Sequence, residues 1–177
     1  ILGSIPLVIV GYIFYSTNLI DQFRNLKVVA WTTLIFGILL YFSDKFELKN
    51  KISSELNIKS IIIIGLFQIL AIIPGVSRSG IVITASRFLK FDRVESSKIA
   101  FYLSIPALAG ASVLGFKDVI DDQINFDAIF IFSTSASFLF SYFTIKYFLI
   151  YVKMFSLSFF VIYRIVLSII LFSIIYL

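Results

Sequence analysis

Two hydroxyls and one guanidinium lie within a short, glycine-flanked stretch of the 177-residue chain, where they could bind a phosphate group. The stretch reads Gly75-Val76-Ser77-Arg78-Ser79-Gly80. A planar guanidinium donates paired hydrogen bonds to phosphate oxygens, and glycines let backbone N–H groups approach an anion. A helix that begins at Ser79-Gly80 would add the partial positive charge of its N-terminus. The stretch therefore predicts a site for a phosphorylated ligand.

A purely structural interpretation of the same residues stays open at this point. Ser77 and Ser79 are residue types that commonly cap helices, and Arg78 could extend its charged end to a lipid headgroup. Gln68 lies ten residues before Arg78. Its amide could orient water or a phosphate oxygen, or it could form a hydrogen bond between helices. As a neutral group it is not a general base.

The elements that carry these residues must lie in a membrane. The chain is 60% hydrophobic and 14% charged, with a mean hydropathy of +1.05, far from the composition of soluble domains. It contains no cysteine and no histidine, which excludes disulfides, thiolate metal sites and imidazole catalysis. The net charge of +5 comes from Lys and Arg scattered among short loops, so we expect no nucleic-acid partner.

Apolar runs separated by polar stretches predict an all-α, polytopic bundle of transmembrane helices. The expected spans are residues 2–19, 27–43, 99–116, 128–145 and 154–177, with loops at 44–59 and 146–153. The run from Ser60 to Ile73 is too short to cross a hydrocarbon core of about 30 Å, and it ends at Pro74-Gly75. A second short run, Ile81 to Leu89, follows the polar stretch. Residues 60–90 are therefore predicted to form a re-entrant helical hairpin.

The distribution of positive charge supports this hairpin. A hairpin returns to its own side of the membrane, so it collects ten basic residues on one side and three on the other. The larger group is Lys45, Lys49, Lys51, Lys59, Arg87, Lys90, Arg93, Lys98, Lys146 and Lys153, and the smaller is Arg24, Lys27 and Lys117. The positive-inside rule then places the basic loops in the cytoplasm and the C-terminus outside.

The stretch from Gly65 to Gly80 resembles the second signature of the undecaprenyl-diphosphate phosphatases, or bacitracin-resistance proteins. That signature reads Gly-x-x-Gln-x-x-Ala-x-x-Pro-Gly-x-Ser-Arg-Ser-Gly, and every defined position matches. The resemblance continues through Phe101 to Ala107 and through Tyr163-Arg164, and it covers essentially the whole chain in order. Ala100 and Ser168 depart from the usual Ser and Gly of the family, and we interpret both as tolerated packing changes.

The resemblance implies a fold of two inverted repeats and an enzyme of the bacterial inner membrane. Its reaction would convert undecaprenyl diphosphate into undecaprenyl phosphate and phosphate, which recycles the carrier lipid for peptidoglycan synthesis and confers bacitracin resistance. Arg78, Ser77 and Ser79 would then be catalytic, and Gly75, Gly80 and Gln68 would bind substrate. A divalent cation, Mg²⁺ or Ca²⁺, is also implied. A polyprenyl-phosphate flippase is the alternative function, and a homo-oligomer stays an open alternative.

The family's first signature, which carries glutamates, serines and a histidine, has no counterpart here. The chain also begins at Ile1 without a Met, so we expect a single membrane domain, residues 1–177, that is a fragment and is inactive alone. No metal site is identifiable in it. Asp92 and Glu95 are expected in a solvated network with Arg87, Lys90, Arg93 and Lys98. Arg164 is an intramembrane charge with two equal interpretations, a part of the diphosphate site or a tie to a helix C-terminus.

Overall fold

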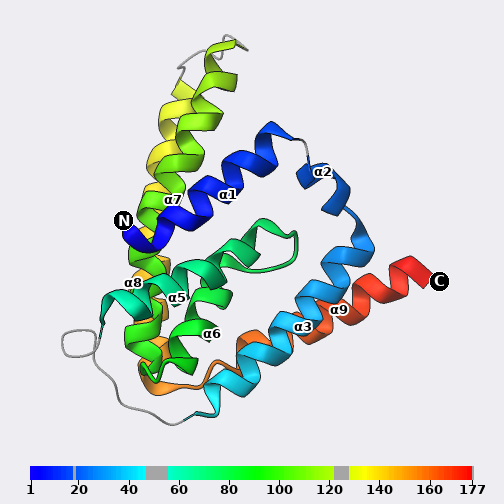
Figure 1. Ribbon diagram of the computed structural model, residues 1–177, viewed down its shortest axis with the longest axis vertical. Helices are drawn as coiled ribbons and strands as arrows, with labels where there is room; N and C mark the ends of the chain where they lie inside the picture. The colour runs from blue at the N-terminus through cyan, green and yellow to red at the C-terminus, as the bar shows by residue number, and fades with distance from the viewer. Residues whose placement is uncertain (18, 47–55, 122–127, 177) are drawn as a thin grey trace.

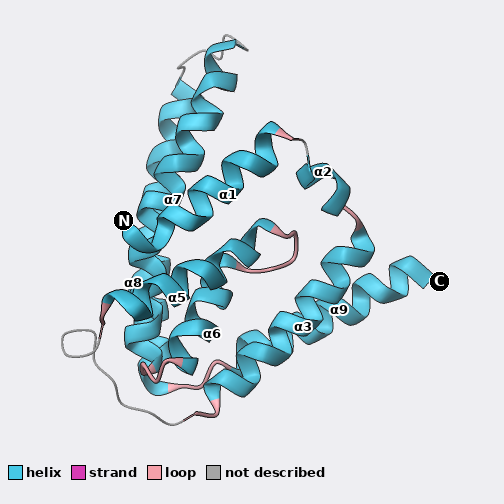
Figure 2. Cartoon of the chain, in the orientation of Figure 1, coloured by secondary structure: helices cyan, strands magenta, loops and turns pink. Residues whose placement is uncertain are grey.

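The chain forms helices joined by short turns in the computed structural model, which describes residues 1–17, 19–46, 56–121 and 128–176 (Figure 1). The side chains of residues 20–21, 114 and 116–121 are not described. The elements, in chain order, are η1 (Leu2–Ser4), α1 (Ile5–Ser16), α2 (Leu19–Phe23), α3 (Leu26–Asp44), α5 (Ile58–Ile69), η2 (Leu70–Ile72), α6 (Arg78–Phe88), α7 (Arg93–Asp121), α8 (Ala128–Met154) and α9 (Ser158–Tyr176). No strand occurs in the described residues, which confirms the all-α class (Figure 2).

Among the described residues, three helices are long and apolar enough to cross a membrane: α3, α8 and α9. They have 19, 27 and 19 residues. At a rise of 1.5 Å per residue, 19 helical residues extend about 28 Å, close to the thickness of a hydrocarbon core. The protein is therefore a helical membrane protein with several spans.

Helices α5 and α6 are too short to span, and they pack against each other as the two arms of a hairpin. They have 12 and 11 residues, or about 18 and 16 Å of helix. Each begins with a side-chain cap, because Asn57 accepts a hydrogen bond from the Ser60 N–H and Ser77 accepts one from the Gly80 N–H. These bounds agree with the predicted hairpin at 60–90. Its entry from one side of the membrane stays a prediction.

The second arm of the hairpin, α6, forms the centre of the molecule. Every residue from Ile81 to Arg87 is buried, and the helix packs against α3, α5 and α7 (Figure 1). The first arm lies tightly on the N-terminal turn, because a Cβ added at Gly65 would collide with the backbone of Gly3. Both arms are thus fixed by neighbours that are distant in sequence.

Three predicted boundaries are wrong. The first helix ends at Ser16 rather than at residue 19, because the Ser16 and Thr17 hydroxyls both bond to the Ile13 carbonyl and close the last turn. Residues 146–153, predicted as a loop, continue α8 to Met154, since the apolar residues between Lys146 and Lys153 keep the helical pattern. Helix α7 already starts at Arg93, six residues early, where the Asp92 carboxylate caps the Glu95 N–H.

Candidate functional site at the hairpin tip

The turn between α5 and α6, the hairpin tip, is residues 73–77, and helix α3 holds it in place. Gly75 has a φ of +87°, a left-handed conformation that favours glycine. A Cβ at Gly75 would also collide with the Thr32 hydroxyl and the Val29 backbone. Thr32 donates a hydrogen bond to the Pro74 carbonyl at 2.7 Å. Glycine at position 75 is therefore required for α3 to approach the tip this closely.

Ser77 and Ser79 lie together at the start of α6. The Ser77 Oγ accepts a hydrogen bond from the Gly80 N–H at 3.2 Å and lies 3.3 Å from the Ser79 Oγ. Ser77 is thus a helix cap, as the structural interpretation predicted, yet both serines remain exposed. The first N–H groups of an α-helix have no partner within the helix and carry its positive dipole end. Hydroxyls and backbone dipoles that suit an anion therefore share one accessible place.

The side chain of Arg164, on α9, lies close to Ser77 and Ser79. Its side chain is buried, with 8% of its surface exposed. Nη2 donates to the Gly75 carbonyl at 2.8 Å, and Nε donates to the Thr33 carbonyl at 3.3 Å. Arg164 is therefore a tie, but to the middle of α3 and to the hairpin tip rather than to a helix C-terminus.

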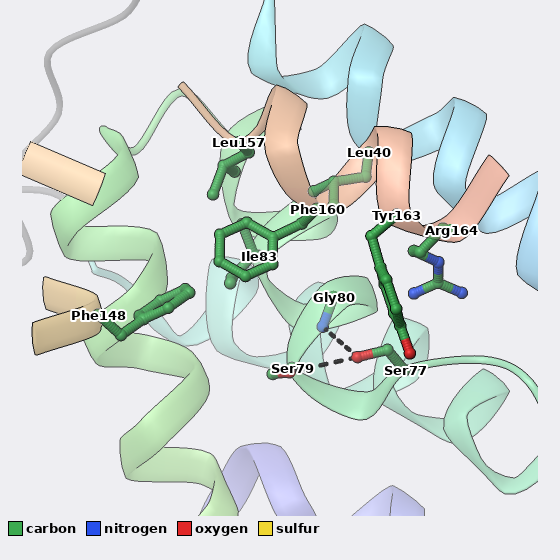
Figure 3. A pocket seen from close by; sticks show the side chains of 10 residues that line it. All are labelled: Leu40, Ser77, Ser79, Gly80, Ile83, Phe148, Leu157, Phe160, Tyr163 and Arg164. Atoms are coloured by element: carbon green, nitrogen blue, oxygen red, sulfur yellow. Dashed lines mark hydrogen bonds between the residues drawn. The ribbon is translucent and has the colours of Figure 1, made fainter. Parts of the chain in front are cut away.

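The same arginine also lines a cavity with the two serines, so the two interpretations of Arg164 are compatible. The cavity has a volume of about 220 Å³, and its polar half comprises Ser77, Ser79, Gly80, Tyr163 and Arg164 (Figure 3). A Cβ at Gly80 would lie 3.2 Å from Arg164 Nη1 and from Ser77 Oγ, which shows how close these groups are. Nη1 makes no hydrogen bond with the described residues. The polar half thus combines a spare guanidinium donor with two hydroxyls.

The other predicted site residues lie outside this cavity. Arg78 is half-buried next to it and forms no ion pair with a described residue, while Gly75 shapes the turn behind it. Gln68 is fully buried in α5, and neither its Oε1 nor its Nε2 has a partner among the described residues. A buried amide without partners is costly, which makes Gln68 an unexplained feature of the hairpin. The roles predicted for these three residues stay predictions.

At the other end of α6, one charge of the predicted solvated network, Arg87, is buried, which corrects that expectation for this residue. The others are exposed or partly exposed: Lys90, Asp92, Arg93, Glu95 and Lys98. Asp44 and Arg87 expose 6% and 4% of their surfaces. The Asp44 carboxylate accepts from Arg93 Nε at 2.6 Å and from the Leu157 N–H at 3.0 Å. Arg87 donates to the carbonyls of Asp44, Phe46 and Phe91. We call this group the hairpin base: Asp44, Arg87, Phe91, Arg93 and Leu157.

The charges farther along α7 do not belong to the hairpin base. Glu95 pairs with Lys98 at 2.8 Å within the first turns of α7, as a partly exposed pair of the kind predicted. The sequence also predicts an acidic loop at Asp118, Asp121, Asp122 and Asp127, and these side chains lie outside the described part of the chain. Sequence reasoning missed Asp44, because it stood at the edge of a predicted loop.

The implied divalent cation finds few ligands around the cavity. Its described polar groups are two hydroxyls, a phenol and a guanidinium, and a guanidinium repels a cation. Mg²⁺ and Ca²⁺ prefer carboxylate and carbonyl oxygens. No group of three His, Cys, Asp or Glu side chains occurs among the described residues. The residues of the cavity therefore fit a phosphate and do not by themselves fit the cation.

The fold and this cavity together define the class: a polytopic helical membrane protein with a partly polar cavity at the tip of a helical hairpin. The chain belongs to the family of bacitracin resistance protein BacA, whose family model matches residues 1–170.

Curated relatives agree with this assignment. An undecaprenyl-diphosphatase of Pelagibacter ubique is 59% identical over 99% of this chain and 69% of its own length. A protein of the same name from Elusimicrobium minutum is 42% identical over 97% of the chain and 64% of its own length. One from Thermobifida fusca is 34% identical over 99% of the chain and 60% of its own length. The chain thus spans about two thirds of the length of these relatives.

Proposed function

We propose that the protein hydrolyses undecaprenyl diphosphate to undecaprenyl phosphate and phosphate in the bacterial inner membrane. Through this reaction it recycles the carrier lipid for peptidoglycan synthesis and confers bacitracin resistance. The observation that carries the proposal is the cavity at the hairpin tip, where Arg164 Nη1 and the hydroxyls of Ser77 and Ser79 converge. The activity in the names of three relatives, aligned over nearly the whole chain, supports the same substrate.

In this proposal the residues of the chain bind the diphosphate and stabilise the charge that builds up on the transferred phosphoryl group. The Ser77 and Ser79 hydroxyls bond to phosphate oxygens at the N-terminus of α6. Arg78, which forms no ion pair with a described residue, turns its guanidinium to the same phosphate. Donors arranged in advance where charge develops are usually the largest contribution to catalysis. Gln68 orients water or a phosphate oxygen from the first arm of the hairpin.

Activation of the attacking group is assigned to another part of the protein. The described residues around the cavity include no carboxylate, and the chain contains no histidine. The relatives are longer than the matched region, which leaves room for these groups. A divalent cation, Mg²⁺ or Ca²⁺, would be held mainly by the diphosphate and by that other part.

Phosphate release tests this proposal. One sample is the chain alone, and the other is the chain joined to the part of the Pelagibacter ubique relative that the match leaves out. We expect both proteins to insert into membranes and only the joined protein to release phosphate from undecaprenyl diphosphate. Turnover by the chain alone would contradict the assignment of the activating groups. Translocation of the lipid by the joined protein without hydrolysis would favour the flippase instead.

A further inference from the structure

The cavity at the hairpin tip continues into an apolar half that the binding of phosphate does not use. Its walls are Leu40 of α3, Ile83 of α6, Phe148 of α8, Leu157 in the turn before α9, and Phe160 of α9. In Figure 3 these side chains lie together on one side of the cavity, and the serines and Arg164 lie on the other. One cavity thus joins a site for an anion to a site for a hydrocarbon.

The apolar half is built rigidly. The Phe148 and Phe160 rings lie 5.4 Å apart, and each contacts a further ring, Phe101 at 5.7 Å and Tyr151 at 5.7 Å respectively. Leu40, Ile83 and Leu157 are buried in the core. Aromatic pairs at these separations stabilise one another beyond the area that they bury. The walls therefore keep a fixed shape for a ligand.

The apolar half also borders the most exposed helix of the molecule. Helix α8 has one buried residue, Val152, among its described side chains, so its apolar surface is available to lipid. Phe148 lies on this helix one turn before Val152. A chain that enters the apolar half past Phe148 would therefore continue directly into the hydrocarbon of the bilayer.

The volume sets how much of a lipid the cavity holds. Its 220 Å³ is below the range of about 300–1,000 Å³ that is typical of pockets for drug-sized ligands. A diphosphate and the first isoprene units fill it, and the rest of a long polyprenyl chain remains among lipid tails. Because lipid tails are as apolar as the walls, these contacts position the substrate more than they add affinity.

We propose that the apolar half of the cavity receives the isoprene units next to the diphosphate, so that Phe148 and Phe160 are specificity-determining residues for prenyl diphosphates. This inference rests on the proposed function. It deepens that function, because it assigns the direction in which the tail leaves the phosphate site. It also predicts that the selection of substrates depends on the first isoprene units and not on the total length of the tail.

The test uses the joined protein described above, with farnesyl diphosphate and undecaprenyl diphosphate as substrates and inorganic pyrophosphate as a tail-less inhibitor. We expect Phe148→Ala to lower kcat/KM for both substrates by a similar factor of about ten, the low end of the discrimination that an apolar pocket provides. Inhibition by pyrophosphate should stay unchanged. The matched control is Phe140→Ala on the same helix, where the ring is 75% exposed, and it should change none of these values.

Two results would overturn the inference. One is a pyrophosphate inhibition constant that rises as kcat/KM falls, because the ring would then act through the phosphate site. The other is an unchanged kcat/KM in Phe148→Ala. If Phe148→Ala does not fold, Phe148→Trp, which narrows the apolar half, decides by the same criteria. The joined protein without substitutions tests the proposed hydrolysis by itself. If it releases phosphate, the proposed function stands even where the Phe148 variants contradict the assignment of the tail.

Discussion

The two ends of helix α6 use the same chemistry for opposite purposes. At the hairpin base, Arg87 donates to three carbonyls and Arg93 pairs with the buried Asp44. At the hairpin tip, Arg164 uses only Nε and Nη2 for carbonyls, and Nη1 faces a cavity. Arg87 and Arg164 each have one nitrogen without a hydrogen bond to a described residue, but Arg87 Nε lies 3.8 Å from the buried Asp44 carboxylate, whereas Arg164 Nη1 lies towards the cavity. The surroundings of the unused donor therefore distinguish an anchor at the base from a group available to a ligand at the tip.

The largest expected effect lies at the base. Asp44→Ala leaves Arg87 and Arg93 without their carboxylate and the Leu157 N–H without its acceptor. Breaking a buried pair in this way costs about 3–5 kcal/mol, so we expect a corresponding loss in the free energy of unfolding in detergent. Asp44→Asn, which keeps an acceptor for Leu157, should lose less. A stability of Asp44→Asn equal to that of the parent would show that the carboxylate charge does not hold the base together.

At the tip the expected effect is on turnover. Arg78→Ala in the joined protein should lower kcat/KM by about 10²-fold or more, because a donor to the developing charge is lost. Arg78→Lys should also fail badly, since an ammonium does not reproduce the paired bonds of a guanidinium. Phosphate release measures both variants, and the melting temperature should stay near that of the parent. Lys153→Ala at the exposed end of α8 is the control, and near-normal activity of Arg78→Ala would remove this residue from the site.

We expect substitution of Arg164 to lower both the stability, as at the base, and the turnover, as at Arg78. In Arg164→Lys the single ammonium does not serve the Thr33 carbonyl, the Gly75 carbonyl and a phosphate together. Each buried polar group left without a partner costs about 1–3 kcal/mol, so both the unfolding free energy and kcat/KM should fall. Parallel unfolding and kinetic measurements check this. A loss of stability with unchanged kinetics would make Arg164 an anchor like Arg87.

The smallest expected effect is at the contact between α3 and the tip. Thr32→Val removes the hydrogen bond to the Pro74 carbonyl and should lower the unfolding free energy by about 1 kcal/mol. Thr17→Val, at the exposed end of α1, removes only a bond within its own helix and is the matched control. If both variants lose the same stability, the bond to Pro74 has no special role in holding the tip.

The elements of the fold followed from local sequence, but the partners of buried charges did not. Helices too short to span, a Pro-Gly turn and a serine cap are visible within 30 residues, and the observed hairpin follows them. By contrast, Arg87 bonds to the carbonyl of a residue 43 positions away, and Asp44 accepts from Leu157, 113 positions away. A run of charges between apolar segments looks the same whether it is solvated or enclosed by other helices, so the buried Arg87 was predicted as solvated.

The candidate site shows the same division. Ser77, Ser79 and the glycines stand out because they are adjacent in sequence, and their types suit phosphate. Arg164 was noticed as a costly charge in the membrane, but its position beside Ser77 depends on how α9 packs against α3. The aromatic wall at Phe148 and Phe160 carries no local signal in a chain with 21 phenylalanines.

The bond from Arg164 to the Gly75 carbonyl has a consequence for biosynthesis. The two residues are 89 positions apart, and ribosomes add about 5–20 residues per second, so Arg164 follows Gly75 by about 4 to 18 s. During that interval the Gly75 carbonyl lacks the Arg164 donor, and only the long bond from the Thr33 hydroxyl, at 3.5 Å, can form with the described residues already made. The hairpin thus reaches the membrane before the helix that completes its tip. Slowing translation between α6 and α9 should therefore prolong the exposure of a nascent chain to proteolysis.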